Sequence, residues 1–155
     1  VIMLAAVVAA LASCQSKANK AAEAEADSIA IEAMSPTVEA TEVYEGTLPA
    51  ADGPGIRYVL TLNMLADAND TTYTLDMTYL DADGQGKDKT FTSAGKPQMI
   101  QKTVKNKKKS ALKLTPNDGS EPVYFVIAND TTLTLSNDSL QEAVSDLNYD
   151  IVRVK

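Results

Sequence analysis

The sequence of 155 residues contains no histidine, no tryptophan and a single cysteine, Cys14. Without histidine there is no Ser-His-Asp triad, no HExxH zinc site and no imidazole that could act as a general base. The nucleophile-elbow, phosphate-loop and dinucleotide-binding motifs are absent as well. Most Asp and Glu residues fall in expected loops or among the first 41 residues, where a carboxylate is ordinarily solvated. We therefore expect a protein that is not an enzyme and that uses no cofactor.

An apolar segment, residues 1–13, ends directly at the only cysteine. It carries no charge and is shorter than the roughly 20 residues that a membrane-spanning helix needs. Leu11-Ala12-Ser13-Cys14 resembles a bacterial lipobox, at which signal peptidase II cuts before the cysteine and acyl chains such as palmitate are attached. The alternative, a cysteine buried in a core helix, fits poorly with the polar, Lys- and Ala-rich sequence that follows. We expect a signal peptide over residues 1–13 and a lipidated Cys14.

The residues on either side of this segment refine the expectation. The chain begins at Val1 without the Met and the basic region of a signal peptide, which we interpret as a truncated 5′ end or a late start. Gln15 rather than Asp follows the cysteine, and by resemblance to known sorting rules this favours the outer membrane. Several acyl chains give stable anchoring, because each buried CH₂ contributes about 0.8 kcal/mol. Whether the anchored protein faces the periplasm or the outside stays open.

Residues 14–41 are expected to form a flexible tether. The segment is rich in Ala, Glu, Ser and Lys and contains no aromatic residue. It cannot bury enough apolar surface to offset the entropy of ordering. Residues 42–155 are then long enough for one domain of ordinary size.

Within residues 42–155 short stretches of alternating polar and apolar residues recur between turn signals, which is typical of an all-β sandwich or barrel. The expected strands are 42–48, 56–64, 72–80, 88–93, 98–104, 110–115, 122–128, 131–136 and 147–154. Closure into a barrel removes exposed sheet edges. The prediction is therefore a small antiparallel barrel with meander connections.

The opening part of this domain, Tyr44 to Ile56, combines a strand, a stiff loop and the start of a second strand. Pro49 and Pro54 cannot donate to a β-ladder, and Asp52-Gly53 is a turn dipeptide. The residues alone predict a rigid hairpin connection.

The same residues resemble a known family. The pattern Y-x-G-x-L-P-C-x-D-C-P-G-I is the fingerprint of the NlpE N-terminal domain of bacterial outer-membrane lipoproteins linked to copper resistance and envelope stress. This chain matches it except at the two cysteines, where Ala50 and Gly53 stand. The segment 147–153 also resembles the last strand of the family. The resemblance implies a lipocalin-like barrel and a role in copper or envelope-stress response.

The loss of both thiols bears on metal binding. Paired thiolates can hold Cu(I) or form a disulfide, but Ala50 has no donor atom and Gly53 has no side chain. With no histidine and with Cys14 lipidated, only methionines remain as soft ligands. We therefore expect no tight copper site and no thiol chemistry.

A basic run stands out against the net charge of −7. Its members are Lys102, Lys105, Lys107, Lys108 and Lys109. They could contact lipopolysaccharide phosphates, an anionic lipid or an acidic partner, or they could be a solvated hairpin tip turning at Asn106. Nucleic acid is disfavoured as a partner by the acidic chain and the export signal.

Two functions are the main ones in consideration, and an outer-membrane structural or adhesion component is a weaker third. The first is a non-catalytic envelope lipoprotein that acts through contacts with an envelope protein in stress or copper-response signalling. The second is a carrier of one small apolar ligand inside the barrel. The side chains that would line such a cavity are Tyr58, Met64, Tyr73, Met77 and Tyr79. The partner and the oligomeric state stay open.

Overall fold

The computed structural model describes residues 37–66 and 70–155. The expected signal peptide, Cys14 and the tether up to residue 36 lie outside the described residues. Among those described, no helix is long and apolar enough to cross a membrane.

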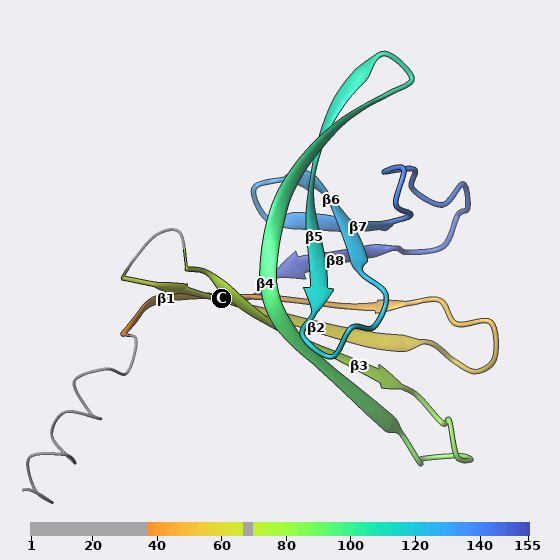
Figure 1. Ribbon diagram of the computed structural model, residues 1–155. Coiled ribbons are helices and arrows are strands. Elements are labelled where there is room, and N and C mark those ends of the chain that lie inside the picture. Colours follow the sequence, from red (N-terminus) through yellow and green to blue (C-terminus); the bar gives the residue numbers. More distant parts are fainter. Residues whose placement is uncertain (1–36, 67–69) are drawn as a thin grey trace, which may run out of the picture. The chain divides into compact units, whose positions relative to one another are not determined.

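Eight antiparallel strands form one closed barrel in which each strand pairs with the next and the last pairs with the first (Figure 1). They are β1 (Val38–Leu48), β2 (Ile56–Leu65), β3 (Thr72–Tyr79), β4 (Lys89–Val104), β5 (Lys107–Pro116), β6 (Val123–Asn129), β7 (Thr132–Ser136) and β8 (Asp150–Arg153). The all-β prediction and the meander barrel are confirmed.

The strand β4 corrects the prediction of nine strands, because the segments expected at 88–93 and 98–104 are one continuous strand of 16 residues. Its first part pairs with β3 and its second part with β5, and the change of partner occurs at Gly95. A Cβ at Gly95 would collide with the carbonyl oxygen of Thr115 and would lie 3.1 Å from Tyr73 Cε1. The Gly-Lys-Pro sequence that interrupts the alternation is therefore a barrel corner and not a break between strands.

Three strand starts also differ from expectation. β1 begins at Val38, four residues before the expected strand, and β5 begins at Lys107, three residues early. β8 is confined to Asp150–Arg153 instead of 147–154. The side-chain amide of Asn148 donates to the carbonyl groups of Thr47 and Asp150, at 3.2 and 3.1 Å. These bonds hold Asn148 outside the ladder, so β8 starts later than the apolar pattern indicates.

The interior of the barrel is filled by the inward faces of the strands. The alternation predicted for residues 56–64 is confirmed, since Tyr58, Leu60 and Leu62 are buried. The rings of Tyr58 and Phe125 meet edge to face, with centroids 6.2 Å apart. The buried members of this core are Tyr44, Leu48, Tyr58, Leu60, Leu62, Tyr73, Leu75, Leu114, Phe125, Leu133 and Ile151.

A second, smaller core lies on the outer face of β4, β5 and β6. Ala111 and Val126 point away from the barrel interior, and the fully buried Leu140 packs on them from the segment between β7 and β8. Leu140 has a φ of 58°. The Asn137 side-chain oxygen accepts hydrogen bonds from the backbone N–H groups of Ser139 and Gln141, at 3.0 and 2.9 Å. This tight turn fastens the β7–β8 segment to the outside of the barrel.

Candidate functional site

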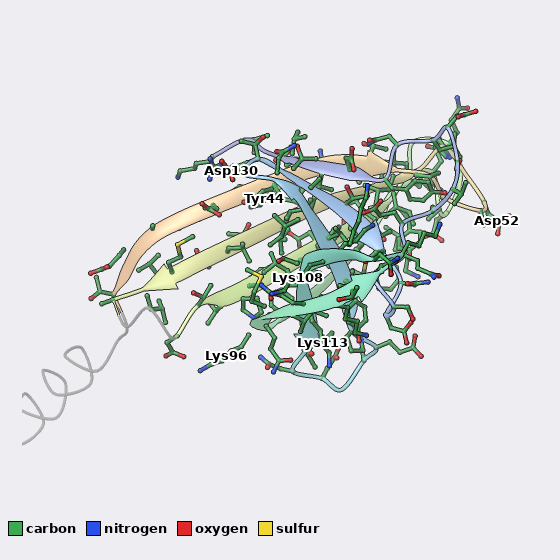
Figure 2. The ribbon with its side chains drawn as sticks, turned by 90° about the horizontal axis from the view of Figure 1, so that it is seen from above. Tyr44, Asp52, Lys96, Lys108, Lys113 and Asp130 are labelled. Atoms are coloured by element: carbon green, nitrogen blue, oxygen red, sulfur yellow. The ribbon has the colours of Figure 1, made fainter. Side chains whose placement is uncertain are left out.

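The stiff loop between β1 and β2 projects from one end of the barrel, and Figure 2 shows Asp52 at its tip, far from Lys108 and Lys113 on β5. Leu48 is buried at the start of the loop. At its end the Gly55 carbonyl accepts a hydrogen bond of 3.0 Å from the Leu80 N–H. Gly53 has a φ of 110°, a conformation that favours glycine. The predicted rigid connection is thus tied to the core on one side and to the end of β3 on the other.

The glycine of the preceding strand, Gly46, marks where β8 closes the barrel. An added Cβ would collide with the Asp150 carbonyl oxygen and would lie 2.9 Å from Ile151 Cγ2. Nearby, Arg153 Nη1 donates to Glu42 at 2.9 Å, and the Tyr44 hydroxyl donates to the same carboxylate at 3.0 Å. These groups therefore join the first and last strands.

The first half of β4 presents one unpaired edge and an exposed aromatic ring. Residues 89–93 pair with β3 on one side, whereas the described ladder with β5 begins only at Gly95. Phe91 is 48% exposed, with the Tyr79 ring edge-on at 5.6 Å and the Lys89 ammonium 5.3 Å from its centroid. We refer to residues 89–93 as the Phe91 edge. It was not among the sites expected from sequence, because an isolated Phe in an alternating strand is ordinarily interpreted as core.

The opposite end of β4 forms a hairpin tip with β5, and all five lysines of the basic run lie on it. Lys105 and Asn106 make the turn with φ values of 49° and 62°, as a two-residue hairpin turn requires. Lys102 and Lys109 stand directly opposite each other, where like charges repel.

The β7–β8 segment offsets this repulsion. Lys102 donates to the Asp138 carbonyl at 2.5 Å, and Lys109 forms an ion pair of 2.8 Å with Glu142. In the part of the chain that the structure describes, Lys105, Lys107 and Lys108 form no ion pair. Two of the five lysines thus fasten the hairpin to the segment, and the other three carry charge that no ion pair among the described residues balances.

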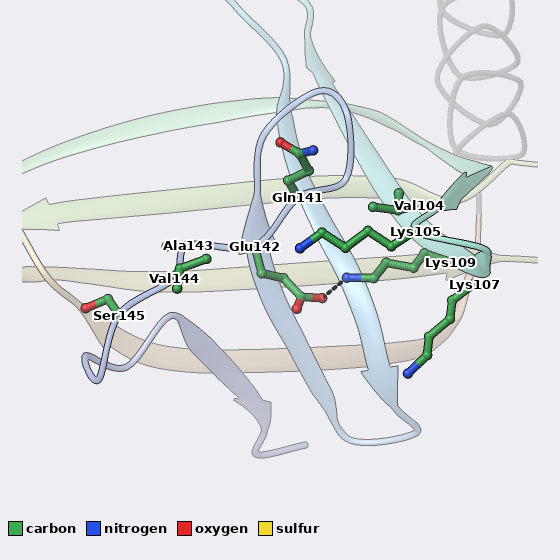
Figure 3. A pocket seen from close by; sticks show the side chains of 9 residues that line it. All are labelled: Val104, Lys105, Lys107, Lys109, Gln141, Glu142, Ala143, Val144 and Ser145. Carbon is green, nitrogen blue, oxygen red and sulfur yellow. Dashed lines mark hydrogen bonds and ion pairs between the residues drawn. The ribbon is translucent and has the colours of Figure 1, made fainter.

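A cleft of about 620 Å³ lies between the hairpin tip and the β7–β8 segment. Figure 3 shows Lys105 and Lys109 reaching from the hairpin toward residues 141–145 on the facing side. Val144 on that side is fully exposed. We call this site the lysine cleft; it is lined by Val104, Lys105, Lys107, Lys109, Gln141, Glu142, Ala143, Val144 and Ser145. Sequence reasoning found the lysines but missed the facing segment, which is distant along the chain.

The family model of the NlpE N-terminal domain matches residues 44–146 of this chain. The chain belongs to the NlpE N-terminal domain family. Neither the curated proteins nor the solved structures give a significant match. The match includes the opening motif and ends before β8, so the resemblance suggested for residues 147–153 falls outside it. The chain is accordingly an NlpE-like envelope protein.

The two positions at which this NlpE domain departs from the family motif differ in backbone geometry. Ala50 lies in the half-exposed beginning of the loop, and Gly53 lies at its exposed turn with a φ of 110°. In the described ranges, 37–66 and 70–155, no three His, Cys, Asp or Glu side chains come together in a way that could hold a metal ion. The loop geometry therefore predicts different outcomes when a cysteine is placed at each position.

We expect Gly53→Cys to lower the free energy of unfolding by about 1–3 kcal/mol, because a side chain at this φ strains the backbone. Ala50→Cys is the matched control and should change the free energy by less than about 0.5 kcal/mol, since it alters a surface position without such strain. Denaturant unfolding under reducing conditions measures both. Equal stabilities of the two variants would show that the loop accepts a side chain at residue 53 freely.

The residues expected to line a ligand cavity separate into two groups. Tyr58 and Tyr73 are buried in the main core, whereas Met64, Met77 and Tyr79 are half-buried, with Met77 packed against that core. Burial raises the pKa of the Tyr58 and Tyr73 phenols above the usual value, because a phenolate would lose its hydration. Both are therefore neutral at physiological pH. The Tyr73 hydroxyl is buried and finds no hydrogen-bond partner among the described residues.

Proposed function

We propose that this NlpE domain acts as a non-catalytic, lipid-anchored module of the bacterial envelope, held at the outer membrane by Cys14 and working through contact with an envelope protein. Family membership supports the envelope setting. The role in stress or copper-response signalling follows from the same resemblance, without the thiol site that Ala50 and Gly53 have replaced. Titration of the protein with Cu(I) should accordingly reveal no submicromolar affinity.

The observation that carries the contact function is the Phe91 edge. A strand with one unpaired edge offers N–H and C=O groups to an extended segment of another protein. Phe91 adds a large apolar surface in the middle of this edge, and aromatic residues are enriched among those that anchor protein interfaces. Lys89 at the beginning of the edge limits pairing with copies of the same chain, because edge lysines repel each other.

The second candidate, a small-ligand carrier, is less well supported. A cavity large enough to hold a ligand would leave exposed area on the side chains that form its walls. Leu60, Leu75, Leu114 and Phe125 at the centre of the barrel have none. Close packing of these side chains favours a filled interior, and a filled interior favours action through the outer surface.

Site-specific photocrosslinking in intact cells tests the proposed function. A photoreactive residue in place of Phe91 should capture an envelope protein, and the capture should disappear when Cys14→Ser removes the anchor. The matched control places the photoreactive residue at Asp83, in the exposed turn between β3 and β4. Identical captures with and without Cys14 would show that the anchor does not bring the domain to its partner. The absence of capture at residue 91 would overturn the assignment of the Phe91 edge.

A further inference from the structure

The charge of this protein is divided unevenly between the hairpin tip and the rest of the chain. Residues 102–109 contain five lysines and no acidic residue, while the whole chain carries −7, so the other residues together carry −12. A negatively charged surface would repel most of the molecule and attract only the tip. An acidic protein with one basic end therefore has one preferred orientation toward an anionic surface.

The tip is also amphiphilic. Lys105 and Lys107 line the lysine cleft together with Val104, and Val144 on the facing segment is fully exposed. Leu147, three residues further along, is 59% exposed. A soluble phosphate makes no favourable contact with these apolar side chains. A lipid surface, in contrast, binds lysine ammonium groups at its headgroups and apolar side chains below them.

The acidic residues of the β7–β8 segment do not cancel the positive charge of the hairpin tip. The Glu142 carboxylate is paired with Lys109, and the backbone carbonyl of Asp138 accepts a hydrogen bond from Lys102. The carboxylates of Asp138 and Asp146 form no ion pair with a described residue. Lys105, Lys107 and Lys108, which the segment does not bind, outnumber these two carboxylates.

We propose that the hairpin tip and the facing β7–β8 segment form a docking surface for an anionic lipid membrane. Lys105, Lys107 and Lys108 contact the phosphate groups, and Val144 and Leu147 enter the boundary between headgroups and acyl chains. The proposal goes beyond the contact function assigned to the Phe91 edge and does not depend on it, because the two surfaces lie at opposite ends of β4.

Vesicle binding of the purified full chain, with Cys14→Ser in every sample, tests the proposal. Binding is measured on phosphatidylcholine vesicles with and without phosphatidylglycerol, and the increase caused by phosphatidylglycerol is the quantity compared. The N-terminal residues are the same in all variants, so differences between variants report the tip. Lys105→Gln/Lys107→Gln should weaken the lipid-dependent increase about 30-fold, since each lysine near an anionic surface contributes about fivefold.

The matched control is Lys87→Gln/Lys89→Gln, which removes the same charge at the opposite end of β4. It should change binding by no more than about twofold, because these residues lie well beyond a Debye length of about 10 Å from the docked surface. Val144→Ser, at a fully exposed position, should weaken binding by about threefold to tenfold.

Several results would overturn the proposal. Equal binding to vesicles with and without phosphatidylglycerol would exclude a preference for anionic lipid. Equal losses of binding in the two double-lysine variants would exclude the hairpin tip as the docking site. Inorganic phosphate that displaces the protein at submillimolar concentration would indicate a site for a soluble anion. Because the vesicles contain no protein partner, failure here leaves the crosslinking result at Phe91 unaffected, and failure there leaves this one unaffected.

Discussion

Gly46→Ala should lower the free energy of unfolding by about 3 kcal/mol or more, which is large for the addition of one methyl group. The new Cβ would collide with the Asp150 carbonyl oxygen and would press on the backbone and side chain of Ile151. Neither neighbour can rotate away, because one is backbone and the other is fully buried. Overpacking of a well-packed site costs about 1–3 kcal/mol and sometimes more. Here the strands β1 and β8 would have to separate.

A suitable control is Gly84→Ala in the turn between β3 and β4. Gly84 has a φ of 115°, and an added Cβ would meet nothing within 4 Å. This variant isolates the cost of backbone strain, about 1–2 kcal/mol, from the cost of a collision. Denaturant unfolding monitored by far-UV circular dichroism gives both values. A loss at Gly46 no greater than that at Gly84 would contradict the close approach of β8.

Leu140→Ala should lower the free energy of unfolding by about 2–5 kcal/mol, the range for deletion of a fully buried leucine side chain. The position is unusual because it lies in a loop and not in a strand. Leu140 is 0% exposed and fills the small outer core with Ala111 and Val126. The variant should also weaken vesicle binding, since Leu140 fixes the segment that carries Val144.

The control for this substitution is Leu147→Ala in the same segment. Leu147 is 59% exposed, so its truncation should change the free energy of unfolding by less than about 0.5 kcal/mol. Thermal or denaturant unfolding of the two variants side by side separates burial from residue type. Similar losses would mean that the β7–β8 segment is not fastened to the barrel through Leu140.

The sequence predicted the barrel because its inner face depends on local alternation. Tyr58, Leu60 and Leu62 in β2 and Tyr73 and Leu75 in β3 repeat with period two and are all buried. Such a repeat is visible along a single strand and needs no knowledge of distant segments. The family resemblance rested mainly on Tyr44 to Ile56, the strand and loop that precede β2, and the family model covers these residues.

The outer core and the lysine cleft could not be predicted in the same way. Leu140 is flanked by polar residues on both sides, and no periodic pattern distinguishes it from Val144 and Leu147, which are exposed in the same loop. Its partners Ala111 and Val126 lie on other strands. For the same reason the sequence could not indicate which lysines are bound by the β7–β8 segment. Only folding brings Asp138 and Glu142 next to Lys102 and Lys109. Contacts between distant segments leave no periodic signal.

Because β4 is one continuous strand, it sets the distance between the hairpin tip and the Phe91 edge. Its 16 residues span about 50 Å if fully extended, at about 3.3 Å for each residue, and the bend at Gly95 shortens this reach. When the hairpin tip is docked on a bilayer, the Phe91 edge at the other end of β4 would lie tens of ångströms above the headgroups. Phe91 would then be available to proteins located at that height. The length of one strand would thus decide which layer of the envelope the protein can touch.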